Sequence, residues 1–146
     1  MIRYEPLLVS YRGVALPKDF EMSVTPVYGA ILAVLFVALS LRVIFSRRTG
    51  GTSLGDGGDD RLLRRIRVHG NFAEYVPLAL LLMALVELRG LPGSYLHIMG
   101  LLLTSGRLLH AYGVSLGVGW ARVAGMALTF TTLLAAALAN LALNSI

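Results

Sequence analysis

Long apolar blocks separated by short polar segments dominate the pattern along this chain of 146 residues. The blocks begin near Val24, Phe72, Tyr95 and Val123, and the last of them, VAGMALTFTTLLAAALANLAL, contains no charged residue. A helix needs roughly 20 mainly apolar residues to cross the core of a bilayer. Because an open sheet edge cannot face lipid and no alternating pattern appears, we expect an all-α membrane protein with four transmembrane helices.

Short connections set the topology expected for these helices. Residues 49–60 are rich in glycine and end in acidic residues, which predicts a flexible loop with Asp59 or Asp60 as the N-cap of the second helix. Residues 89–93, RGLPG, predict a tight turn, and residues 113–119, GVSLGVG, predict a short loop. Since connections this short join antiparallel neighbours, the helices should form an up-down bundle.

Residues 1–21 differ in character from the rest of the chain. They mix polar and apolar positions without a sustained period, include Pro6 and Pro17, and resemble neither a signal peptide nor a membrane span. Met22, which directly precedes the first apolar block, would make a natural start. We therefore expect residues 1–21 to be an N-terminal leader that reflects an over-extended start, followed by one membrane domain over residues 22–146.

The charged residues are distributed as membrane topology requires. The chain has 13 Lys and Arg against 8 Asp and Glu. By the positive-inside rule, the basic segment between the first two helices is cytoplasmic and both termini lie on the opposite side. Topology thus accounts for the basic composition and argues against nucleic-acid binding. The arginines in question are Arg47, Arg48, Arg61, Arg64, Arg65 and Arg67.

A polar stripe precedes the second apolar block, in the stretch RVHGNFAEY. At about 100° per residue, Arg67, Asn71, Glu74 and Tyr75 share one face of a helix. Charged groups in membrane helices almost always face the bundle interior or a water-filled site. The stripe therefore predicts a binding site, although an interhelical hydrogen-bond network or a snorkelling basic collar would produce the same pattern.

The third and fourth helices carry polar residues that can face this stripe. Arg107 lies within an apolar segment and needs a partner, for which we expect Glu74, while His110 on the same face is an ordinary structural hydrogen-bonding residue as readily as a site residue. Arg122 ends a stripe of small and polar residues that predicts a packing face, and as an alternative it is a positive-inside anchor. That stripe comprises Gly125, Thr129, Ala136 and Asn140.

These groups predict the chemistry of a ligand. Arginine forks bind carboxylates, and asparagine and glutamate engage amide and ammonium groups, so the set suits a small, anionic, peptide-like molecule. The chain has no cysteine, so a thiol would have to come from a substrate. No metal site is expected, because His69, His97 and His110 are not at a paired ligand spacing.

The second-helix motif resembles that of the MAPEG family, the membrane-associated proteins of eicosanoid and glutathione metabolism. The motif reads RxHxNxxEY followed by Pro77, and SLRVIFSRR (40–48) and GRLLHAYG (106–113) resemble the family's first and third helices in the same order. Arg122 stands where the family places a catalytic arginine. The resemblance covers about residues 22–144 and is closest to a bacterial inner-membrane subgroup.

The resemblance implies a homotrimer of four-helix bundles that binds glutathione between neighbouring subunits. Arg122 would stabilise the glutathione thiolate: a free thiol has a pKa of about 8.5, and a nearby cation in a low-dielectric site lowers it by roughly two, about 2.7 kcal/mol. The thiolate then attacks a hydrophobic electrophile from the bilayer. The residues implied to bind glutathione are Arg67, His69, Asn71, Glu74 and Tyr75, beside Arg48 or Arg47, with Arg107 in support.

Two functions follow from this resemblance. The leading one is a membrane-bound glutathione transferase, with peroxidase activity as a further possibility, and the alternative is a non-catalytic membrane protein of the same fold that binds a lipid or another ligand. Val114 and Val123 stand where some family members carry a tyrosine and a serine, which argues against a dedicated prostaglandin or leukotriene synthase. A transporter or channel subunit is disfavoured because no inverted repeat appears.

Overall fold

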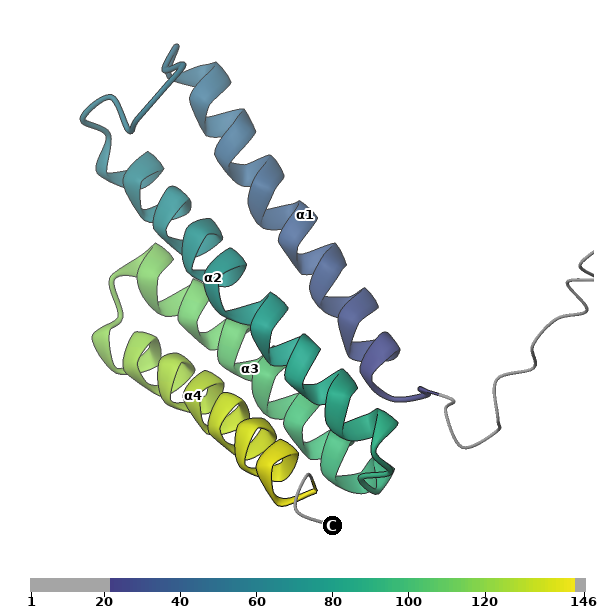
Figure 1. Cartoon of the computed structure of the whole chain (residues 1–146). Coiled ribbons are helices and arrows are strands. Elements are labelled where there is room, and N and C mark those ends of the chain that lie inside the picture. The colour runs from purple at the N-terminus through teal and green to yellow at the C-terminus, as the bar shows by residue number, and fades with distance from the viewer. Residues whose placement is uncertain (1–21, 144–146) are drawn as a thin grey trace, which may run out of the picture.

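A computed structural model describes residues 22–143, which form four helices and no strand (Figure 1). The helices are α1 (Thr25–Thr49), α2 (Asp60–Leu88), α3 (Gly93–Leu116) and α4 (Gly119–Ala142). Consecutive helices run in opposite directions, so the up-down topology is confirmed (Figure 1). The expected leader, residues 1–21, lies outside the described residues.

Three of the described helices, α1, α2 and α4, are long and apolar enough to cross a membrane. The predicted number of helices, four, is correct. However, α3 is not among the helices apolar enough to span a membrane, although with 24 residues it is as long as α4. The reason is its polar content, which includes Arg107, His97 and His110. Because Arg107 and His110 are buried in the bundle, these two residues of α3 do not meet lipid.

The ends of the helices follow local chemistry. Asp59 is the N-cap of α2, and its carboxylate accepts a hydrogen bond of 2.8 Å from the backbone N–H of Arg61, as expected. The predicted loop over residues 113–119 is wrong, because α3 continues to Leu116 and only Gly117 and Val118 connect it to α4. Gly117, with φ of 72°, supplies the left-handed turn that ends α3.

Glycines bring α3 and α4 into close contact. A Cβ added to Gly113 or Gly125 would collide with the backbone of the opposite helix, at Arg122 and His110 respectively. In a membrane, helices associate through close packing rather than through the hydrophobic effect, and small residues on facing helices permit this close packing. The small face predicted for α4 is confirmed as a packing face, since its members Gly125, Thr129 and Ala136 are buried. Thr132, which the prediction did not include, is buried with them.

The helix α1 packs mainly on α2. At one end, the Glu87 carboxylate of α2 accepts hydrogen bonds of 2.7, 2.7 and 2.8 Å from the backbone N–H groups of Ser23, Val24 and Thr25. Since Val24 provides no side-chain cap, Glu87 satisfies the free N–H groups of α1 from another helix. The core between the helices is apolar, with Leu32, Leu39, Val68, Phe72, Met83 and Leu103 among its buried residues.

Candidate functional site

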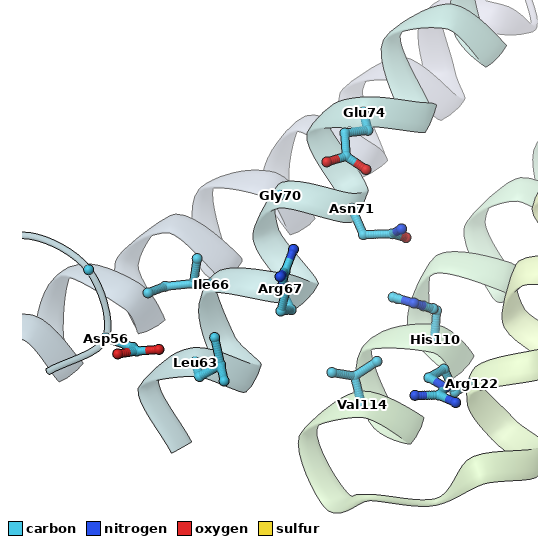
Figure 2. Close-up of a pocket in the computed structure, with 11 residues that line it drawn as sticks. Asp56, Leu63, Ile66, Arg67, Gly70, Asn71, Glu74, His110, Val114 and Arg122 are labelled. Carbon is cyan, nitrogen blue, oxygen red and sulfur yellow. The ribbon is translucent and has the colours of Figure 1, made fainter. Parts of the chain in front are cut away.

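A cleft of about 750 Å³ opens between α2 and the α3–α4 pair, next to the loop between α1 and α2 (Figure 2). Its volume lies within the range of about 300–1,000 Å³ that is typical of small-molecule sites. Charged groups line both sides of it. The lining residues are Gly55, Asp56, Leu63, Ile66, Arg67, Gly70, Asn71, Glu74, His110, Val114 and Arg122.

The wall formed by α2 contains three of the four residues of the predicted stripe. Arg67, Asn71 and Glu74 line the cleft on successive turns, as the helical spacing predicts (Figure 2). Arg67 and Glu74 are exposed and make no side-chain hydrogen bond within residues 22–143. Tyr75 is instead half-buried behind this wall, where its ring meets the ring of Phe130 edge to face at 5.5 Å.

The opposite wall places Arg122 next to His110 (Figure 2). Arg122 lies in the first turn of α4 and is exposed, whereas His110 of α3 is only 6% exposed. The close backbone contacts at Gly113 and Gly125 fix the position of this part of α4 against α3. The guanidinium of Arg122 faces Arg67 and Asn71 across the cleft. It is therefore held in place by two packed helices rather than by a loop.

Arg107 is buried beneath the cleft, with 2% of its surface exposed. Its guanidinium donates a hydrogen bond of 2.6 Å to Oδ1 of Asn71, a second of 3.4 Å to the sulfur of Met126, and lies 6.0 Å from the Tyr75 ring centroid. The expectation that Glu74 pairs with Arg107 is wrong. Glu74 shares a helix face with Asn71, but it is exposed in the cleft, so the shorter Asn71 reaches the buried guanidinium.

Two of the predicted binding residues lie away from the cleft. His69 points toward α1, where its ring stacks on Phe36 at 4.8 Å and its Nε2 lies 3.0 Å from Oγ of Ser40. Arg48 is exposed near the end of α1. Within one chain neither residue lines the cleft.

A second, apolar cleft of about 380 Å³ adjoins the first. The two clefts share Asn71, His110 and Arg122, and the remaining lining side chains are those of Val123, Met126, Ala127 and Phe130. Arg122 thus stands where a polar compartment meets an apolar one. This arrangement permits a charged molecule and an apolar molecule to meet at one guanidinium.

Comparison with known proteins agrees with this geometry. The model of the MAPEG family matches residues 25–142, which include all four helices. This chain belongs to the MAPEG family. Two relatives, both called inner membrane protein YecN, come from Escherichia coli strain K12 and from E. coli O6:H1, strain CFT073. Each is 38% identical over 118 residues, covering 81% of this chain and 90% of the relative. No solved structure matches the chain.

Membership in the MAPEG family makes the chain a membrane protein of the glutathione and eicosanoid group, and known members use glutathione as a substrate. The name of the YecN relatives describes a location and no reaction. Within residues 22–143 there is no group of three or more His, Asp or Glu side chains able to hold a metal ion.

Two residues that line the cleft of this MAPEG protein are only weakly indicated by the sequence. Asp56 lies in the glycine-rich loop, and its carboxylate accepts a hydrogen bond of 3.0 Å from the Gly58 N–H. Loop residues have no helical period, so no spacing connects Asp56 with the stripe on α2. His110 lines the cleft, and the sequence signals for it are the helix face that it shares with Arg107 and its place in the GRLLHAYG stretch.

Proposed function

We propose that this MAPEG protein is a membrane-bound glutathione transferase that binds glutathione in the charged cleft and activates its thiolate with Arg122. The observation that carries the proposal is that α2 and α4 present Arg67, Asn71, Glu74 and Arg122 to one cleft. Glutathione has two carboxylates and one ammonium group. Two guanidinium groups and the carboxylates of Asp56 and Glu74 complement that charge pattern.

Arg122 is the residue to which we assign the chemistry. A guanidinium keeps its positive charge at physiological pH, so it favours the thiolate over the thiol without itself exchanging a proton. The thiolate sulfur then forms a bond to an electrophilic carbon, and the leaving group departs with the bonding electrons. The adjoining apolar cleft is suited to hold an electrophile that arrives from the bilayer.

The working unit that we propose is a homotrimer in a bacterial inner membrane, with the α1–α2 loop on the cytoplasmic side. The location follows the name of the YecN relatives, inner membrane protein. The trimer follows the family resemblance, and it offers Arg48 and His69 a way to contribute, since neither lines the cleft within one chain. The mass of the purified protein in detergent, measured by light scattering, tests the trimer directly.

The experiment that tests the proposed reaction is a conjugation assay with detergent-solubilised protein, glutathione and an activated aryl halide. Wild type should form the thioether, and Arg122→Ala should lose about 100-fold in rate, the size expected when one stabilising donor is removed. Arg89→Ala is the matched control, because Arg89 lies in the turn at the opposite end of the bundle, where its side chain donates a hydrogen bond of 2.8 Å to the backbone oxygen of Asn140. Glutathione binding without conjugation of any electrophile would favour the non-catalytic alternative.

A further inference from the structure

The buried guanidinium of Arg107 has no carboxylate partner among residues 22–143. Its hydrogen bonds go to the Asn71 oxygen at 2.6 Å and the Met126 sulfur at 3.4 Å, and its Nε has no partner. A charge in this environment is costly unless hydrogen bonds satisfy it. The short contact to Asn71 is therefore the main polar interaction that Arg107 makes.

This contact decides which way the Asn71 amide faces. A guanidinium donates hydrogen bonds and cannot accept them, so Asn71 must turn its oxygen toward Arg107. The amide nitrogen makes no hydrogen bond within the described part of the chain. Because Asn71 lines the cleft, that nitrogen is the polar group it can offer there.

We propose that Arg107 is a positioning residue that fixes Asn71 as a hydrogen-bond donor toward the cleft. The ligand must then present a carboxylate or carbonyl oxygen at this point, and its ammonium belongs with one of the two cleft carboxylates, Asp56 or Glu74. This inference rests on the proposed function and deepens it. It narrows the sequence-based expectation that Asn71 and Glu74 both engage amide and ammonium groups.

The test compares two substitutions of similar size at Asn71. Asn71→Asp keeps an oxygen for Arg107 but cannot donate, so its thermal midpoint should equal or exceed that of wild type while its Kd for glutathione rises at least about tenfold. Asn71→Leu can neither accept a hydrogen bond from Arg107 nor donate one toward the cleft. Its thermal midpoint and its affinity for glutathione should therefore both fall. Both quantities are measured on the same detergent-solubilised protein, by thermal unfolding and by isothermal titration calorimetry.

The role of Arg107 is tested by repeating Asn71→Asp in Arg107→Met. There the new carboxylate has no guanidinium, so Asn71→Asp should lower the thermal midpoint relative to Arg107→Met alone. Unchanged glutathione affinity in Asn71→Asp would overturn the inference, and so would a midpoint shift that is the same with and without Arg107. Failure of wild type to bind glutathione is a separate result, which removes the proposed function and this inference with it.

Discussion

Gly113 of α3 lies directly against the backbone of Arg122 of α4. A Cβ at Gly113 would collide with the backbone nitrogen of Arg122, and one at Gly125 would collide with the backbone of His110. The two helices therefore touch through backbone at the level of the cleft. This contact fixes the direction from which the Arg122 guanidinium enters the site.

We predict that Gly113→Ala lowers both the conjugation rate and the thermal stability of the protein. Overpacking of this kind costs about 1–3 kcal/mol, whereas a displacement of about 1 Å in a reacting group can cost about 100-fold in rate. Rates and thermal midpoints should be measured together. Gly119→Ala is the control, since a Cβ there meets no atom within 4 Å. A Gly113→Ala protein with wild-type activity would show that this contact does not position Arg122.

The Glu87 carboxylate provides the second prediction, on stability. Glu87→Gln replaces one of its two acceptor oxygens by an NH₂ group, so at least one of the three backbone N–H groups of α1 loses its partner. Loss of such a hydrogen bond costs about 1–3 kcal/mol. The thermal midpoint of Glu87→Gln should be lower than that of wild type. Its glutathione affinity should be unchanged, because Glu87 does not line the cleft. An unchanged midpoint would argue that this end of α1 contributes nothing to stability.

The apolar cleft provides a prediction about the second substrate. Ala127 lines the apolar cleft but not the charged one. Ala127→Trp should therefore raise KM for the electrophile several-fold while Kd for glutathione stays within about twofold. Leu134→Trp, at a position on α4 with 64% exposure, is the control for a large ring on this helix. Equal KM values in the two variants would place the electrophile elsewhere.

The topology can be tested by cysteine labelling, because the chain contains no cysteine. Ser53 lies in the loop between α1 and α2, and Ser94 lies in the first turn of α3 at the opposite end, and both are exposed. In intact spheroplasts, a membrane-impermeant maleimide should label Ser94→Cys and spare Ser53→Cys until the membrane is broken. The reverse pattern would contradict the cytoplasmic assignment of the loop.

The sequence predicted the helices because their apolar blocks are long and their connections short. It also predicted the wall of the site formed by α2, since Arg67, Asn71 and Glu74 share a face whatever packs against them. It did not predict where α3 ends. The glycine-rich sequence predicts Gly113 as a loop residue, whereas in the structure α4 packs on α3 at this position.

Contacts between residues of different helices could not be predicted from the spacing of residues along the sequence. A periodic pattern shows which face of a helix a residue occupies, but it does not show which residue of another helix lies at the same level. For this reason the sequence favours Glu74 as the partner of Arg107, whereas the structure shows Asn71. His69 belongs to the same motif as Arg67 but lies just over half a helical turn away from it, so it packs on α1. Asp56 was missed because its position depends on how the loop folds over the cleft.

The most direct test of the central claim is the ultraviolet thiolate absorbance of glutathione, titrated near pH 7 into wild type, Arg122→Ala and Arg89→Ala. We predict a saturable thiolate signal in wild type and in Arg89→Ala, and its loss in Arg122→Ala with glutathione still bound by calorimetry. A thiolate signal in Arg122→Ala equal to that of wild type would contradict the role assigned to Arg122.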